Sequence, residues 1–242
     1  MASERPELSH SGAIGRNLTY ALLDSLGRAI VTGRYDGSPF PTEAELAREH
    51  GVSRSVTREA VKMLTAKGLL TARPRKGTSV QPASSWNLFD ADVLRWLLER
   101  KFSLDLLRQF TELRIAIEPA AAALAARGAH EAGIKGISAG YDRMEAAERG
   151  DDDPLEADIA FHIAIMQAAA NPFYMQFRDV VETALRTSIR FTNRFKGRTA
   201  SLPQHHEVLA AIERRDPEQA KAAMIALIAD VMALIDEAEA KG

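Results

Sequence analysis

The 242-residue sequence contains no cysteine, which excludes disulfide bonds, thiolate catalysis and cysteine-ligated zinc sites. Aromatic residues make up only 6% of it, and no apolar run approaches the roughly 18 residues that a membrane-spanning helix needs. The first dozen residues are polar and lack the apolar core of a secretory signal. We therefore expect a cytoplasmic protein that begins with a disordered arm over residues 1–12.

Acidic and basic residues nearly balance over the whole chain, at a net charge of −2, but they are unevenly distributed. Residues 14–80 contain 11 Lys and Arg against 6 Asp and Glu, whereas residues 81–242 carry a net charge of −6. A basic segment attracts phosphate backbones, although random scatter of surface charge would give the same count. The asymmetry makes nucleic acid a candidate partner without establishing it.

The first third of the chain has the pattern of a winged helix-turn-helix domain over residues 13–81. Apolar residues recur at every fourth position of a first helix, expected near 15–34: Leu18, Leu22, Leu26 and Ile30. Two shorter helices, expected over 43–50 and 53–67, are each preceded by a Thr or Ser cap and followed by Gly. Strand-forming residues then flank a turn within 69–80, which predicts a small β-hairpin, the wing.

The start of the second short helix and the wing carry side chains suited to DNA. A recognition helix presents its N-terminal residues in the major groove, where Arg pairs with guanine and Ser or Thr reaches bases or phosphates. The residues predicted to contact DNA are Ser53, Arg54, Ser55, Thr57, Arg58, Arg75, Lys76 and Gly77. Two surface helices with ordinary arginines are the alternative at this point.

Residues 82–90 combine proline, serine and aromatic residues and are interpreted as a linker that packs against a neighbouring element. From residue 91 to residue 242, Gly and Pro are sparse and helical periodicity dominates. Helices are expected near 91–101, 103–127, 130–149, 154–170, 173–196, 203–214 and 217–240. The predicted fold class is mostly α, with the winged helix-turn-helix domain followed by an all-α bundle.

Polar side chains on otherwise apolar helix faces mark a second candidate site. Asp158 and His162 lie four residues apart, on one face of a helix, and the pair His205-His206 opens a later helix. An Asp and two His that converge in a bundle can hold a divalent metal through oxygen and nitrogen ligands. A capped helix with a solvated Asp–His pair is the alternative.

Four further residues are predicted to bind a small carboxylate effector. Arg114 lies beside apolar helix positions, where its guanidinium could clamp a carboxylate or extend to the surface. Arg190 and Asn193 belong to a cluster that includes two more arginines. Asn171 lies at a helix break, where it could instead serve as a cap.

The segment PTEAELAREHGVSRSVTREAVKMLTAKGLLTARPRKGTSV, residues 41–80, resembles the DNA-binding domain of the GntR family of bacterial repressors. The remainder, to about residue 240, resembles the all-helical FCD domain of the FadR subfamily. This resemblance implies a transcriptional regulator and not an enzyme. It also implies a homodimer that binds double-stranded operator DNA through the first domain and a small effector through the second.

The resemblance assigns DNA contacts residue by residue. Arg54, Arg58, Lys76 and Gly77 match family contact positions. Family members commonly have Arg where this chain has Ala44, so one expected DNA contact is missing.

FCD domains commonly hold a metal through an Asp-x-x-x-His pair and two further histidines. On that resemblance Asp158, His162 and His205 match three ligand positions, and the fourth falls on Leu227, which cannot bind a metal. Either three protein ligands hold a divalent ion, Zn2+ being the expected one, with effector or water completing the shell, or the site holds no metal.

The segment WNLFDADVLRW, residues 86–96, resembles that of FadR-subfamily regulators of sugar-acid catabolism, such as those that respond to D-galactonate. The resemblance implies a repressor controlled by a sugar acid such as an aldonate. An acyl-CoA- or hydroxy-acid-responsive regulator of the same family is the alternative. A metal-dependent enzyme and a structural DNA-binding protein without effector are the alternatives from other classes.

Overall fold

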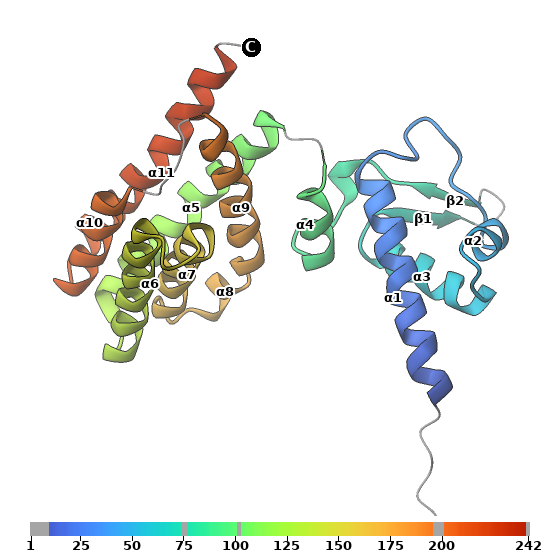
Figure 1. The fold of residues 1–242 in the computed structure, drawn as a ribbon, viewed down its shortest axis with the longest axis horizontal. Coiled ribbons are helices and arrows are strands. Elements are labelled where there is room, and N and C mark those ends of the chain that lie inside the picture. The colour runs from blue at the N-terminus through green and yellow to red at the C-terminus, as the bar shows by residue number, and fades with distance from the viewer. Residues whose placement is uncertain (1–9, 74–76, 101–102, 196–200, 241–242) are drawn as a thin grey trace, which may run out of the picture. The chain divides into compact units, whose positions relative to one another are not determined.

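The chain forms two compact units, Met1–Lys101 and Phe102–Gly242, each of which is described by itself (Figure 1). The computed structural model describes residues 10–73, 77–100, 103–195 and 201–240, and it leaves the side chains of 10–16 and 189–195 undescribed. The structure is predominantly helical with one small two-stranded sheet. The predicted fold class is therefore confirmed.

The N-terminal unit contains a helix-turn-helix followed by a β-hairpin wing. Its first elements are α1 (His10–Val31), α2 (Glu43–Glu49), α3 (Arg54–Ala66), β1 (Leu70–Arg73) and β2 (Gly77–Val80). The strands are antiparallel, with Leu70 opposite Val80 and Arg73 opposite Gly77. Because α1 begins at His10, the end of the segment predicted to be a disordered arm is helical, and residues 1–9 lie outside the described residues.

The helices of the DNA-binding fold pack through the apolar positions that the sequence pattern singles out. Leu22, Leu26 and Ile30 of α1 are at most 3% exposed, and the apolar face of α3 is buried with them. Leu18, the first residue of the predicted face, is 45% exposed instead. The four-residue period therefore predicts the helix correctly but overestimates how far along α1 the core extends.

The segment after the wing packs onto the end of α3, as the linker interpretation expects. It includes a short 3-10 turn, η1 (Ala83–Ser85), and Trp86 Nε1 donates a hydrogen bond to the Gln81 carbonyl oxygen, 3.0 Å away. The Lys67 ammonium, at the C-terminal end of α3, lies 2.7 Å from Asp90 and 2.9 Å from Asp92. These contacts anchor the start of the next helix to the recognition helix.

That next helix, α4 (Ala91–Leu97), belongs to the N-terminal unit. The Trp96 ring lies against Gly27 of α1, where a Cβ atom would come within 2.2 Å of it, and Trp96 Nε1 donates to Asp24 Oδ1 at 2.8 Å. Because α4 packs on α1, the boundary between the units falls after Lys101, whereas the sequence placed it after Asp90.

Truncation of Trp96 is expected to destabilise the N-terminal unit strongly. Trp96 is fully buried, so Trp96→Ala should cost roughly 3–5 kcal/mol of unfolding free energy, through lost burial and the cavity that remains. Urea unfolding followed by far-UV circular dichroism measures this. Trp86→Ala is the matched control, because Trp86 is only half-buried and its loss should cost clearly less. Equal effects would show that Trp96 does not hold α4 on α1.

The C-terminal unit is a bundle in which α5 packs along α11 and α6 packs along α7. Its helices are α5 (Leu104–Gly128), α6 (Glu131–Arg149), α7 (Pro154–Ala168), α8 (Pro172–Met175), α9 (Arg178–Phe195), α10 (Leu202–Glu213) and α11 (Pro217–Glu239). The single helix predicted near 173–196 is divided into α8 and α9, with Gln176 as the C-cap of α8. Among the helices described, none combines the length and hydropathy of a membrane span.

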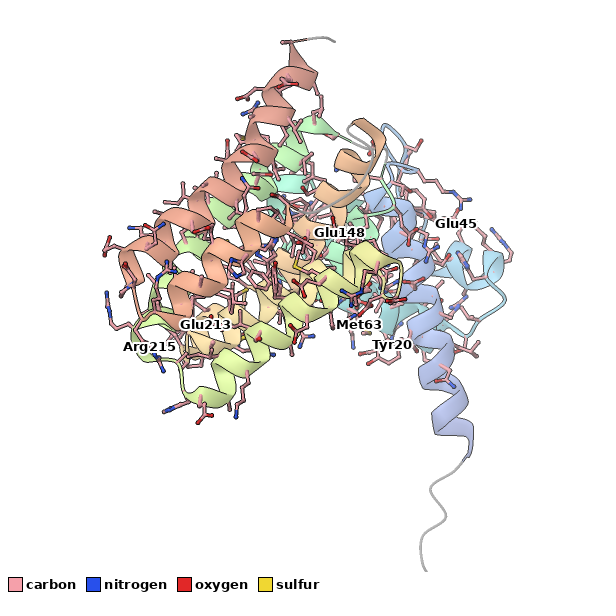
Figure 2. The ribbon with its side chains drawn as sticks, turned by 60° about the vertical axis from the view of Figure 1, so that its left-hand side comes forward. Tyr20, Glu45, Met63, Glu148, Glu213 and Arg215 are labelled. Atoms are coloured by element: carbon pink, nitrogen blue, oxygen red, sulfur yellow. The ribbon has the colours of Figure 1, made fainter. Side chains whose placement is uncertain are left out.

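Charged side chains lie mainly on the outside of the bundle, and apolar side chains fill its interior. Glu148 of α6, Glu213 of α10 and Arg215 in the turn after α10 are exposed (Figure 2). The interior contains alanines of α5 together with larger side chains such as Phe161 and Met166 of α7. The polar residues that lie inside this apolar core therefore require an explanation, because burying polar groups costs free energy unless they are paired.

Candidate functional site

The N-terminal end of α3 presents polar side chains to solvent. Ser53 caps the helix, with its Oγ accepting a hydrogen bond from Val56 N at 3.3 Å. Ser53, Arg54, Ser55 and Arg58 are all exposed. The apolar face of α3 is buried, so these residues form the outward face of the helix that a major groove would meet.

Arg58 is held by a residue of α2. Its Nε lies 3.4 Å from Glu43 Oε2, and the Arg58 side chain is still 63% exposed. A guanidinium presents several N–H donors in a fork, so one edge can contact Glu43 while the other remains available for a base. Ala44, the departure from the family pattern, is also exposed on α2 and offers no such group.

Thr57 requires a correction. It was predicted to contact DNA, but its side chain is fully buried, and its Oγ1 donates to the Ser53 carbonyl oxygen at 3.2 Å. The Thr57 side chain lies on the same face of α3 as Ala60, Val61 and Leu64. Thr57 and Arg58 are consecutive residues, so their side chains point about 100° apart around the helix. Thr57 therefore packs into the core and does not lie on the DNA-facing surface.

Part of the predicted wing contact can be placed. Gly77 is exposed with a φ of +78°, a left-handed conformation that glycine adopts without strain, and a Cβ added there would meet no other atom. Its backbone is therefore open to close approach. Arg75 and Lys76 lie outside the described residues.

The second candidate site is a buried cluster of Asp158, His162 and His205. Each side chain offers one ligand atom, and these atoms all lie within 4.8 Å of one another. All three residues are at most 4% exposed. Asp158 and His162 come from successive turns of α7, and α10 brings His205 to them, as the sequence predicted.

Both histidines turn the same edge toward Asp158. The His205 Nε2 lies 2.9 Å from Asp158 Oδ1, and the His162 Nε2 lies 3.8 Å from it. On its other edge, His205 Nδ1 lies 2.9 Å from the Ser201 carbonyl oxygen. His205 Nε2 makes no hydrogen bond of acceptable geometry within the described chain, although Asp158 Oδ1 lies 2.9 Å from it. A cation between these atoms would satisfy both.

Glu118 of α5 adds a second buried carboxylate that sequence analysis missed. Its Oε2 lies 2.5 Å from His162 Nδ1, and its Oε1 accepts from Arg114 Nε at 2.6 Å. Neither Glu118 nor Arg114 is more than 4% exposed. The four-residue spacing of Arg114 and Glu118 on one helix face was the signal that could have identified the pair.

Both carboxylates are ionised at neutral pH despite their burial. Burial raises the pKa of Asp158, but the adjacent His205 and His162 outweigh it and lower that pKa to about 2. Burial likewise raises the pKa of Glu118, and the Arg114 guanidinium together with the His162 ring lowers it to about 2. The cluster therefore offers two negative charges inside an apolar core.

The predicted effector-binding residues lie in different surroundings. Arg114 is buried against the cluster, and two of its nitrogens already contact Glu118. Asn171 caps α8, with its Oδ1 accepting from Phe173 N at 3.0 Å, which is the cap alternative raised from the sequence. Arg190 and Asn193 lie in α9, but their side chains fall outside the described residues.

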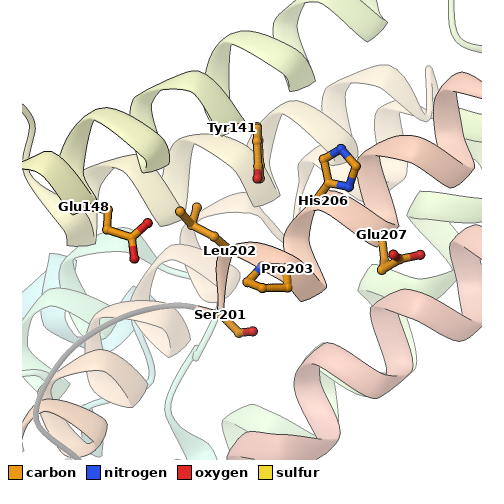
Figure 3. A pocket seen from close by; sticks show the side chains of 7 residues that line it. All are labelled: Tyr141, Glu148, Ser201, Leu202, Pro203, His206 and Glu207. Atoms are coloured by element: carbon orange, nitrogen blue, oxygen red, sulfur yellow. The ribbon is translucent and has the colours of Figure 1, made fainter.

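A surface pocket of about 490 Å³ lies beside α6 and α10 (Figure 3). Tyr141 and His206 lie next to each other in its lining, with ring centroids 5.7 Å apart, and Glu148 and Glu207 add two acidic groups. The side chains that line it in the described part of the chain include no Lys or Arg. The buried cluster, by contrast, contains an arginine.

A winged helix-turn-helix followed by a helical bundle is an architecture of DNA-binding transcriptional regulators. Residues 19–80 match the bacterial regulatory proteins of the gntR family, and residues 109–230 match the FCD domain. The chain belongs to the GntR family and carries an FCD domain, which confirms the resemblance to the FadR subfamily seen in the sequence.

The chain is similar to known regulators over most of its length. It is 34% identical over 218 residues to the galactonate operon transcriptional repressor of Escherichia coli K12, covering 88% of this chain and 94% of that one. It is 30% identical over 218 residues to a putative L-lactate dehydrogenase operon regulatory protein of the same organism, covering 85% and 82%. The solved E. coli McbR/YncC shares the fold, with a TM-score of 0.52 at 16% identity over 92% of this chain and 98% of that one.

These relatives are transcriptional regulators, so the metal-dependent enzyme considered from the sequence is set aside. The chain is a DNA-binding transcriptional regulator and not an enzyme.

Proposed function

We propose that this regulator is a homodimeric repressor that leaves its operator when its C-terminal unit binds a small hydroxy acid, specifically a sugar acid such as an aldonate. The observation that carries the proposal is the buried cluster of Asp158, His162 and His205 with Arg114 beside it. The names of two relatives refer to galactonate and L-lactate. Both compounds are carboxylates with a hydroxyl on the adjacent carbon, so they share one recognition chemistry.

We further propose that the three clustered residues hold a divalent cation, with Zn2+ the expected ion. A nitrogen and oxygen donor set suits Zn2+, and the uncompensated His205 Nε2 facing Asp158 Oδ1 supports this assignment. Leu227, at the family's fourth ligand position, is buried on α11 and cannot bind a metal. When bound, the cation would supply a Lewis-acidic centre whose remaining positions are open to oxygen ligands.

Charge balance favours an anionic effector. Arg114 contributes one positive charge, and Glu118 and Asp158 contribute two negative charges. Metal-ligating histidines are neutral, so these buried side chains sum to −1, and a divalent cation changes the sum to +1. One carboxylate ligand restores neutrality in a region where unbalanced charge is costly.

On the DNA side, we propose that the two recognition helices of a dimer read the half-sites of a palindromic operator, about 34 Å apart. Arg54 and Arg58 read bases, and the wing contacts the backbone. The dimer has one state in which the spacing of its recognition helices matches the half-sites and another in which it does not. An effector that binds the second state more tightly lowers operator affinity, by no more than its difference in affinity for the two states.

A thermal-shift screen tests the effector assignment. We expect an aldonate such as D-galactonate to raise the melting temperature of the full chain, because a ligand that binds only the folded state stabilises it by mass action. L-Lactate and an acyl-CoA are the comparison ligands, each measured with and without a chelator. Stabilisation that survives chelation would contradict the metal assignment, and stabilisation by acyl-CoA alone would contradict the hydroxy-acid assignment.

A further inference from the structure

The two histidines of the cluster are each held on the edge that faces away from Asp158. Ser201 holds His205 by its backbone carbonyl oxygen, 2.9 Å from Nδ1. The corresponding atom of His162, Nδ1, lies 2.5 Å from Glu118 Oε2. The Glu118 carboxylate therefore lies against the Nδ1 edge of the ring, although the contact does not have the geometry of a hydrogen bond.

Glu118 is itself held in place. Arg114 Nε donates to Glu118 Oε1 at 2.6 Å, and Arg114 Nη2 lies 3.4 Å from Oε2. Both residues are on α5, one helical turn apart, and both are buried. A buried carboxylate that leaves one oxygen against an imidazole has few other orientations, because rotating away would leave the Arg114 charge without a partner.

We infer that Glu118 is the positioning residue for His162: it holds the Nδ1 edge of the ring, so that Nε2 is the edge presented to a cation at Asp158. The inference rests on the cation site proposed above. Carboxylates commonly hold the second nitrogen of a metal-ligating histidine in this way, and they fix both the tautomer and the ring orientation. Arg114 completes the chain of contacts by holding Glu118, which gives this arginine a role in the site that does not require it to touch the effector.

The test is the affinity of the full-length protein for Zn2+, measured by competition with a chromophoric chelator. We expect Glu118→Gln to lower that affinity by about 10- to 100-fold, the usual effect of losing such a partner. Glu112→Gln is the matched control, because Glu112 is an exposed carboxylate on the same helix. The melting temperature of each metal-free variant, in chelator, reports separately on folding.

Glu118→Asp separates positioning from a simple effect of charge. It keeps the negative charge and a partner for Arg114 but withdraws the carboxylate by one methylene. If Glu118 positions His162, Glu118→Asp also weakens Zn2+ binding, and the visible absorption spectrum of the Co2+-loaded protein changes in both variants. If Glu118→Asp binds Zn2+ as wild type does, the carboxylate acts only through its charge and the inference is wrong.

The same measurements separate a failure of the Glu118 inference from a failure of the proposed cation site. If wild type binds Zn2+ and both Glu118 variants bind it with the same affinity, Glu118 does not position His162, but the cation site itself is supported. If neither wild type nor Glu112→Gln binds Zn2+ or Co2+, the cation site fails and the inference fails with it. If Glu118→Gln does not fold, Glu118→Asp decides the question, because it preserves the pair with Arg114.

Discussion

Replacing His205 with alanine is expected to lower Zn2+ affinity by more than about 100-fold, because even losing a partner outside the coordination sphere costs 10- to 100-fold. His205 supplies Nε2, which lies 2.9 Å from Asp158 Oδ1. Within the described residues, the only group of potential metal ligands is Asp158, His162 and His205. Isothermal titration of the metal-free full-length protein measures the effect. The same variant should no longer release operator DNA in response to an effector that depends on the metal.

His206→Ala is the matched control for this prediction. His206 is the next residue of α10, but it is exposed and faces Tyr141 in the surface pocket, not Asp158. Its loss should leave Zn2+ affinity unchanged. If His206→Ala abolished binding and His205→Ala did not, the metal would lie in the surface pocket and the assignment of His205 would be wrong.

Replacing Arg58 with alanine is expected to weaken specific operator binding by roughly 5- to 150-fold, the range of one bidentate contact to guanine. Arg58 is 63% exposed on the outward face of α3, with its Nε held by Glu43. Since its side chain makes little contact with the core, the variant should retain the wild-type melting temperature. Fluorescence anisotropy with DNA from the regulator's own upstream region, at one fixed salt concentration, measures the loss.

Arg149→Ala provides the control for charge alone. Arg149 is also 63% exposed and also lies near a carboxylate, that of Asp151, but it belongs to the C-terminal unit. Its removal changes the net charge equally and should leave specific binding within about twofold of wild type, because Arg149 does not belong to the DNA-binding unit. Equal losses in both variants would show that Arg58 contributes only general electrostatic attraction.

Short-range rules explain which features could be predicted from the sequence. Helix caps and apolar periodicity depend on residues within a few positions of one another, so Thr42 and Ser53 before α2 and α3 predict where those helices start. The spacing of Asp158 and His162 likewise predicts a shared helix face. Thr57 was assigned to the DNA-facing surface from its residue type, although it lies three, four and seven residues before Ala60, Val61 and Leu64, which is the spacing of one buried helix face.

Contacts between distant segments required the tertiary structure. Nothing in the local pattern around Trp96 shows that its ring lies against Gly27 of α1, and so the boundary between the units was placed too early. The spacing of Arg114 and Glu118 indicates an ion pair on one helix face, but the contact between Glu118 and His162 could not be predicted locally, because it forms only when α7 packs against α5.

The sequence by itself determined the family, the order of the elements and three members of the buried cluster, because each depends on motifs or spacings readable along the chain. The tertiary structure alone decided which polar groups are buried together and which edges of the histidines face Asp158. Those properties follow from the packing of α5, α7 and α10 against one another, and side-chain packing across sequence-distant helices is not encoded in any local pattern.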